Sequence, residues 1–203
     1  MAAAAGVGAG DDGWQERFDA QERRLQVLED EREVRRTLHD YSHAIDYGLD
    51  EIWLDCFTED ATWSWSVRDL TLQDSLRSRG MPSVPVGVPG VRPALVGEVL
   101  ARAVVGRAQL RTMVGAHTRP PQAWHKHGLM NVEVVVDGDR ADAQSYFVRV
   151  DASGVTTGAF IRAFGRYVDD LVRCGDRRWR IVRRHCELEA HVDEGALLGD
   201  RDR

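Results

Sequence analysis

Two short polar stretches hold the residues whose types suit proton transfer. The first, "YSHAIDYG" at 41–48, places Asp46 near the end of a predicted amphipathic helix, on a face that is otherwise apolar. A carboxylate in that position is costly unless a partner compensates its charge. The second, "WHKHGLMN" at 124–131, supplies histidines, and a histidine oriented by a carboxylate is a general base near neutral pH. The alternative is that Asp46 only bonds backbone groups at the helix end.

The histidines of "HKH" also raise the question of a metal site. His125 and His127 are two residues apart, so on a strand they share one face and could chelate a cation. Glu133 lies on the same face but several residues along, and no third ligand occurs at a sequence spacing typical of a metal site. We therefore predict no metal and expect the histidines to be hydrogen-bonded.

The sequence motifs of nucleophilic and nucleotide-dependent enzymes give little support to chemistry other than proton transfer. No GxSxG or GxxxxGK[ST] pattern occurs in the chain, and the one GxGxxG match, "GAGDDG" at 8–13, lies in the expected flexible tail with no predicted strand before it. Covalent acyl chemistry and nucleotide cofactors are therefore not indicated, and we predict a site that works without a cofactor.

Several large aromatic residues either fill the core or line an apolar pocket; they are Trp53, Phe57, Trp63, Trp65 and Phe147. Such residues are more often core, but a cavity in this domain would be lined by some of them. A pocket lined in this way suits a hydrophobic small molecule. Because no cationic cluster is visible in the sequence, we expect an uncharged polycyclic, aromatic or polyketide-like compound.

A long helix is expected before the first polar stretch. Residues 14–47 contain no Gly or Pro and are rich in Glu, Arg, Gln and Leu. Two apolar stripes occur along it: Trp14, Phe18, Leu25 and Leu28 first, then Val34, Leu38, Tyr41 and Ile45. The first is a heptad-like seam suited to a partner chain, and the second suits the core of the domain. A single helix lying on one surface is the alternative.

The elements that follow indicate an α+β fold. Gly48 ends the helix, residues 49–61 predict a short second helix, and "TWSWSV" predicts a strand. Residues 68–93 carry four prolines and are expected to form an irregular loop or lid, before helical composition returns at 94–113. Long β-rich runs then follow, the first two joined at Asp137-Gly138. We predict a cone-shaped, curved antiparallel sheet wrapped around the N-terminal helices, with a cavity inside.

Composition limits the class of protein. A chain of 203 residues with 43% hydrophobic residues supports one domain, placed at 14–192 between flexible tails at 1–13 and 193–203. The net charge of -6 disfavours nucleic-acid binding. The three cysteines show no CxxC spacing, which favours reduced thiols and a cytoplasmic location. No secretion signal or membrane-spanning run is found in the sequence.

Three segments together resemble a known family. "YSHAIDYGLDEIWLDCFTEDATWSW", "HKHGLMNVEVVVDGDRADAQSY" and "WRIVRRHCEL" are similar to the SnoaL-like branch of the nuclear transport factor two-like superfamily. Within that branch, the resemblance is to the group of scytalone dehydratase, hexachlorocyclohexane dehydrochlorinase and bile-acid dehydratase. It covers about residues 30–190 and excludes the seam and most of the Pro-rich excursion.

The resemblance implies roles for individual residues. Asp46 matches an acid that pairs with a base, His127 matches that base through its spacing to Asn131, and Tyr41 matches a proton donor to the leaving oxygen. The remaining residues expected to contact substrate are Phe57, Trp63, Trp65, Asn131 and Phe147. The last strand offers Arg183, Arg184 and His185 as a further polar residue facing the cavity, and alternation puts Arg183 and His185 on one face. The family's second catalytic histidine has no counterpart in "SYFVRVDAS".

The resemblance implies a cofactor-independent lyase of the dehydratase type, acting on a hydrophobic small molecule and assembling as a dimer or trimer. Two alternatives remain. The same base would serve a polyketide cyclase or an isomerase, and some proteins of this fold bind ligands or assemble without catalysis.

Overall fold

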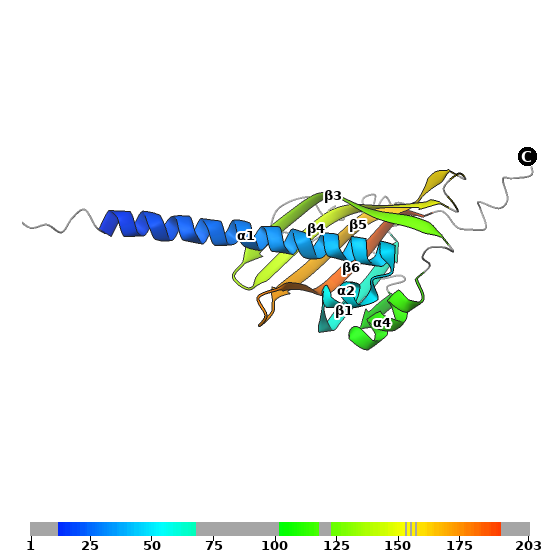
Figure 1. Cartoon of the computed structure of the whole chain (residues 1–203), viewed down its shortest axis with the longest axis horizontal. Helices are drawn as coiled ribbons and strands as arrows, with labels where there is room; N and C mark the ends of the chain where they lie inside the picture. The colour runs from blue at the N-terminus through cyan, green and yellow to red at the C-terminus, as the bar shows by residue number, and fades with distance from the viewer. Residues whose placement is uncertain are drawn as a thin grey trace, which may run out of the picture.

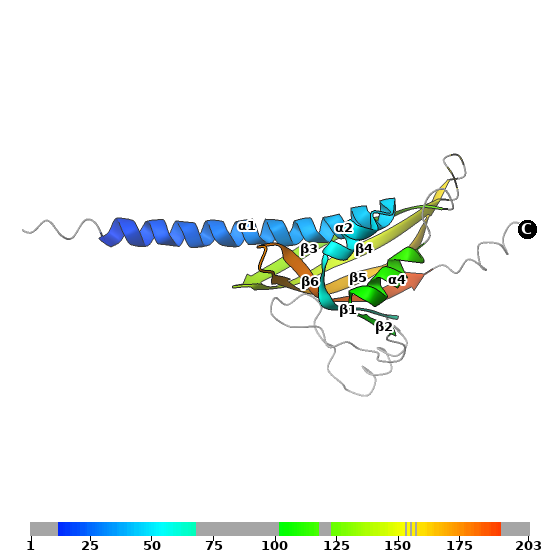
Figure 2. The same cartoon turned by 60° about the horizontal axis from the view of Figure 1, so that its bottom comes forward.

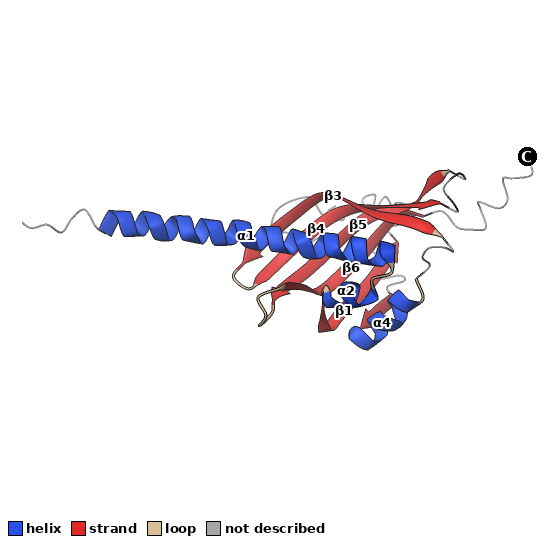
Figure 3. Ribbon diagram, viewed as in Figure 1, coloured by secondary structure: helices blue, strands red, loops and turns tan. Residues whose placement is uncertain are grey.

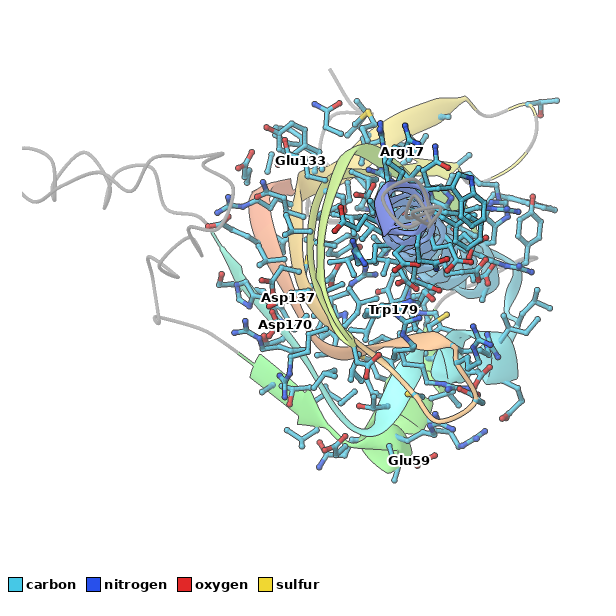
Figure 4. The ribbon with its side chains drawn as sticks, turned by 90° about the vertical axis from the view of Figure 1, so that its left-hand side faces the viewer. Arg17, Glu59, Glu133, Asp137, Asp170 and Trp179 are labelled. Atoms are coloured by element: carbon cyan, nitrogen blue, oxygen red, sulfur yellow. The ribbon has the colours of Figure 1, made fainter. Side chains whose placement is uncertain are left out.

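One long helix dominates the structure and packs against a curved sheet (Figure 1). The computed structural model describes residues 12–67, 102–117, 123–152, 154, 156 and 158–191. Helix α1 (Asp12–Tyr47) runs for 36 residues, and its second half lies along strand β3 (Trp124–Asp137). Viewed along α1, the sheet curves around the helix (Figure 4). The predicted α+β architecture with an N-terminal helix and a curved sheet is confirmed.

The apolar stripe in the second half of α1 fixes the helix on the sheet. Val34, Leu38, Tyr41 and Ile45 are all buried, at a spacing that puts them on one helical face. The helix ends where Gly48 adopts a φ of 68°, a left-handed conformation that glycine takes at little cost. This stop sets the position of Asp46, two residues earlier, at the edge of the sheet.

The first half of α1 projects beyond the sheet (Figures 1 and 2). The four residues of the N-terminal seam, Trp14, Phe18, Leu25 and Leu28, are exposed to between 42% and 57%. No other described element of the chain covers them. The two stripes on α1 therefore have different environments, as their offset predicts.

The sheet contains six strands in the order β2-β1-β6-β5-β4-β3 (Figure 3). Strands β3, β4 (Arg140–Ala152), β5 (Ala159–Arg173) and β6 (Trp179–His191) form an antiparallel meander. The turn predicted at Asp137-Gly138 is confirmed, and Gly138 has a φ of 58°. The meander follows the sequence order because each strand needs only a short turn to reach its neighbour.

The expectation of a wholly antiparallel sheet is wrong, because the sheet is mixed. Strand β1 (Phe57–Val67) pairs parallel to β6, which comes more than a hundred residues later, and β2 (Arg102–Val105) pairs antiparallel to the outer side of β1. Hydrophobic periodicity identifies a strand but carries no information about which distant strand lies beside it.

Two short helices flank β1 and β2, namely α2 (Asp50–Asp55) and α4 (Arg107–Gly115). The helix predicted at 94–113 is only partly correct, since 102–105 form a strand and Gly106, with a φ of 80°, separates it from α4. The predicted Pro-rich loop at 68–93 lies outside the described residues, as do residues 1–11 of the predicted N-terminal tail and the whole predicted C-terminal tail at 193–203. Among the described helices, none carries an apolar stretch long enough to cross a bilayer.

A charged and aromatic cluster closes the space between α1 and the sheet. Arg184 on β6 and Asp169 on β5 are fully buried and joined by two hydrogen bonds of 2.7 and 2.8 Å. The Arg184 guanidinium also lies 4.0 Å from the ring centroid of Tyr41 and 4.3 Å from that of Tyr167. A buried cation is tolerated when it is paired and hydrogen-bonded in this way. The cluster fixes Tyr41 against the sheet.

Strands β5 and β6 lie in close contact at Gly165, next to a register shift. The register between them shifts at Phe164/Gly165, and a Cβ on Gly165 would lie 2.0 Å from the carbonyl oxygen of Glu187. Such a shift increases local twist, which helps the sheet curve around α1. Only glycine fits this contact.

Replacing Gly165 with alanine is expected to destabilise the fold. The added methyl group must push the two strands apart, and overpacking of this kind costs about 1–3 kcal/mol of unfolding free energy. The measurement is the urea midpoint of unfolding. Gly175→Ala is the matched control, because nothing lies within 4 Å of a Cβ at that turn position. Equal midpoints for the two variants would contradict the role assigned to Gly165.

Candidate active site

The carboxylate of Asp46 meets His127 where the end of α1 crosses β3. Its Oδ1 lies 2.6 Å from Nδ1 of the His127 ring, and the backbone N–H of His127 donates to both carboxylate oxygens at 3.0 and 3.2 Å. The two residues are 81 positions apart in the chain. Asp46 is buried, so the charge is compensated by the strand and not by the backbone at its own helix end.

This contact determines which nitrogen of His127 carries the proton. Because the carboxylate accepts at Nδ1, that nitrogen is the donor and Nε2 keeps its lone pair. The same carboxylate would stabilise the ring after it gained a second proton. The arrangement has the chemistry of a general base held ready by an acid.

His127 forms part of the wall of a pocket between α1, α4 and the concave face of the sheet. The cavity has a volume of about 650 Å³, within the usual range for small-molecule sites. Its described wall is largely apolar and aromatic, and includes Ile45, Met113, Val114, Ala163, Tyr167, Cys186 and Leu188. A space of this size and lining is typical of a small-molecule site.

Four other predicted site residues line the same cavity: Tyr41, Trp63, Trp65 and Phe147. Trp63 and Trp65 alternate along β1, so both point to the concave face. Phe57, the first residue of that strand, is instead fully buried behind the pocket against Trp53, with ring centroids 4.7 Å apart. It supports the wall without forming it.

Three predicted residues lie away from the pocket. Asn131 is exposed on β3 with a φ of 50°, at the register shift between Met130 and Glu133. The strand alternation that groups Arg183 with His185 is correct, but it turns both away from the cavity. The concave positions of β6 are those of Arg184, Cys186 and Leu188.

Arg183 and His185 both have hydrogen-bond partners on the convex face of the sheet. The His185 ring lies between the hydroxyls of Ser64 and Ser66, at 2.8 and 2.9 Å. Arg183 donates to Asp170 at 2.8 Å. Alternation along a strand divides its side chains between two faces, but it does not say which face is concave. The sequence therefore could not show that Arg183 and His185 lie on the convex face.

Tyr41 presents a protonated phenol to the cavity. Burial raises its pKa above the usual 10.0, despite the opposing charge of Arg184 beside the ring. The hydroxyl therefore remains a hydrogen-bond donor at neutral pH. This state suits contact with an electronegative atom of a ligand.

Two histidines complete a cluster around Asp46. His125 is buried, its Nε2 lies 3.7 Å from Oδ1 of Asp46, and the same nitrogen lies 3.1 Å from Nε2 of His117 on the α4 side of the pocket. Burial lowers the pKa of His125, and burial together with the neighbouring histidines lowers that of His117 to about 3. Both rings are neutral near pH 7, and His127 is the ring that lies at hydrogen-bond distance from the Asp46 carboxylate.

The same cluster has the residue types of a metal site. Asp46, His125 and His127 offer ligand atoms within 4.8 Å of one another, so Asp46 is the third group that sequence spacing failed to supply. Two features favour hydrogen bonding instead. Asp46 and His127 already lie at hydrogen-bond distance, and Nδ1 of buried His125 has no partner among the described residues. A metal-bound histidine normally donates from its second nitrogen.

The sequence analysis missed a cationic group in the wall. Arg149 on β4 and Arg162 on β5 both line the pocket. Both donate to Asp151, with Nε distances of 2.7 and 3.0 Å respectively. The expectation that cationic clusters are absent is therefore wrong. The alternation of "VRVD" in β4 was the available signal, since it puts Arg149 and Asp151 on one face.

The three cysteines form no disulfide, and Cys56 and Cys186 are buried. Burial raises the pKa of Cys186, which faces the pocket, to about 12, and raises that of Cys56 equally. A thiol in such surroundings stays protonated and inert at neutral pH.

Solved structures similar to this chain share its fold. An NTF2-like protein with a cystatin-like fold from Novosphingobium aromaticivorans is 21% identical, with a TM-score of 0.61 over 94% of this chain and 97% of that chain. Rv3472, a Mycobacterium tuberculosis protein of unknown function, is 22% identical, with a TM-score of 0.56 over 82% and 80%. A Catenulispora acidiphila protein in complex with S-DNPA is 17% identical, with a TM-score of 0.54 over 79% and 94%.

The family is shown by sequence. No curated protein sequence matches the chain significantly. A model of the SnoaL-like domain, however, matches residues 26–185, which include the second half of α1 and the sheet as far as His185. The chain therefore belongs to the SnoaL-like domain family, with the nuclear transport factor two-like, cystatin-like fold.

Proposed function

We propose that the protein is a cofactor-independent lyase that eliminates water from a small molecule with an apolar ring system. The observation that carries the proposal is the 2.6 Å contact between Asp46 and His127 in the wall of a pocket of suitable size. A buried, oriented imidazole beside an apolar cavity is suited to removing a proton from carbon.

The elimination uses two residues in complementary roles. Nε2 of His127 takes the proton next to a substrate carbonyl, and the electron pair of that C–H bond forms the new double bond. The C–O bond breaks, and Tyr41 donates its proton to the departing hydroxyl, which leaves as water. The proton on His127 then returns to Tyr41 through solvent. Acid–base assistance of this kind contributes about 10²- to 10⁴-fold, with substrate orientation adding to it.

A cyclase or isomerase activity is the second candidate. The raised pKa of Tyr41 favours a phenol that holds its proton and only hydrogen-bonds the substrate. The enolate left by His127 would then close a ring or take its proton back at another carbon. Product mass separates the candidates, because elimination removes one water whereas cyclisation without water loss and isomerisation leave the mass unchanged.

Replacing His127 with glutamine is expected to lower kcat by about 10²- to 10⁴-fold, because the amide cannot take a proton. The measurement is turnover of aromatic and polycyclic β-hydroxy carbonyl compounds, followed by mass spectrometry. His43→Gln is the matched control, since His43 is an exposed histidine on the outer side of α1. Full turnover by the His127 variant, with an unchanged circular dichroism spectrum, would refute the mechanism. A wild-type protein that binds these compounds but converts none would instead be a binding protein.

Chelation is expected to leave turnover unchanged. Asp46 is held by its hydrogen bonds to His127, so dialysis against EDTA should alter neither the rate nor the thermal midpoint. Both are measured before dialysis, after it, and after adding back Zn²⁺. Loss of activity that Zn²⁺ restores would replace the acid–base mechanism with a metal-dependent one.

We also propose that the N-terminal seam joins copies of this chain into a dimer or trimer. The seam keeps the heptad-like spacing of a coiled coil, and its apolar side chains stand beyond the sheet. A coiled coil would bury apolar area that the single chain leaves exposed.

The double substitution Leu25→Lys and Leu28→Lys is expected to yield monomers, because it places two charges within the apolar seam itself. Size-exclusion chromatography with light scattering gives the mass in solution. Val27→Lys is the matched control, as Val27 is 44% exposed on the same helix but off the seam. A wild-type monomer, or a double variant with the wild-type mass, would disprove the assembly.

A further inference from the structure

The charged side chains in the described wall of the pocket are both cationic. Arg149 and Arg162 line it, and no aspartate or glutamate of the described residues does so. The rest of that wall is apolar, aromatic or histidine, apart from the protonated thiol of Cys186. A ligand that enters this cavity therefore meets positive charge against an apolar background.

The fold places Arg149 beside the proposed base. In the pairing of β3 and β4, Arg149 is the direct partner of His127, so both side chains leave the sheet on the same face. Neighbouring Cβ atoms in such pairs lie about 4.5–5.5 Å apart. A group bound to Arg149 is consequently within reach of the His127 ring.

A buried acid fixes the guanidinium without neutralising the whole group. Arg149 donates to Asp151 through Nε at 2.7 Å and through a terminal nitrogen at 3.0 Å. A guanidinium has five N–H donors, so three remain for other partners. Asp151 also accepts from Arg162, and these two cations lower its pKa and keep it ionised. Asp151 therefore holds the Arg149 guanidinium in place beside the pocket.

The other described charges near the pocket do not neutralise Arg149 at the wall. Arg184 is paired with Asp169, and neither side chain is exposed. Asp46 is the opposing charge, but it lies behind His127 and accepts hydrogen bonds from both the ring and the backbone of that residue. The surface that a ligand touches is thus cationic on the β4–β5 side.

From this arrangement we infer that the pocket selects an organic anion, namely an aromatic or polycyclic compound that carries a carboxylate, and that Arg149 binds that carboxylate. The inference names the substrate class of the proposed lyase, and it rests on that function only for the orientation of the ligand toward His127. The ring system packs on Trp63, Trp65 and Phe147, while the carboxylate replaces water at Arg149. The expectation of an uncharged substrate, drawn from sequence, is thereby revised.

A matched pair of ligands tests the inference on the full chain. Naphthoate and naphthamide have the same ring system and nearly the same shape, and differ in charge. A charge-assisted hydrogen bond should make the carboxylate bind roughly 10- to 100-fold more tightly. Dissociation constants come from titration calorimetry and from the fluorescence of the pocket tryptophans. Equal affinities for the two ligands, or no binding of either, would overturn the inference.

Substitutions then assign the preference to one residue. Arg149→Gln should bind both ligands alike, at the wild-type affinity for the amide. Arg183→Gln is the matched control, because Arg183 also pairs with an aspartate on the neighbouring strand but on the convex face. If removing Arg149 alone unfolds the chain, Arg149→Gln combined with Asp151→Asn avoids an unpaired buried acid. A preference for naphthoate that survives loss of Arg149 would overturn the assignment.

These experiments test the anion site and the lyase activity separately. His127→Gln should keep the preference for naphthoate, since the carboxylate contact does not need the base. Loss of the preference in Arg149→Gln with turnover untouched by His127→Gln would retain the anion site and reject the lyase. The opposite pattern would retain the lyase and reject the anion site.

Discussion

The hydrogen bonds between Asp46 and His127 tie the helix to the sheet at the point where the pocket begins. A carboxylate this deeply buried is unfavourable by itself, and the imidazole and amide of His127 compensate it. The contact also sets the rotation of α1, because Tyr41 and Ile45 on the same helix then face the cavity. The geometry of the base and the shape of the pocket are thus consequences of one interaction.

The floor of the pocket depends on a second buried charge. Arg184 lies against the faces of Tyr41 and Tyr167 and is paired with Asp169. One cation thus joins helix α1 and strands β5 and β6. Removing one member of such a group leaves an uncompensated charge in the interior, which is strongly destabilising. Tyr41 is therefore held by a rigid neighbour, and a rigid phenol can be aimed at a ligand atom with little loss of entropy.

The electrostatics of the site divide it into three zones. On the α4 side, His117 and His125 are neutral and pack ring against ring, with centroids 4.7 Å apart. On the β4–β5 side, the guanidiniums of Arg149 and Arg162 line the cavity and are held by Asp151. His127 stands between these zones with an acid behind it. A base in that position would remove a proton while the charge left on the substrate develops near a cation, which lowers the barrier to forming it.

The sequence by itself determined the local elements and the residue types. Three local patterns illustrate this: the helical period of Val34, Leu38, Tyr41 and Ile45, the turn at Asp137-Gly138, and the alternation of Trp63 and Trp65. Each pattern involves residues close together in the chain, and the structure confirms each of them. The resemblance of three segments to the SnoaL-like family added the pairing of Asp46 with His127, which no local pattern contains.

Only the tertiary structure decided which surfaces meet. Strand β1 pairs parallel to β6, the convex side of β6 takes Arg183 and His185, and cross-strand register brings Arg149 beside His127. Each of these facts depends on contacts between segments far apart in the chain, whose free energy is shared among many side chains. Alternation along one strand gives two faces, but the helix that packs on one of them decides which becomes the pocket.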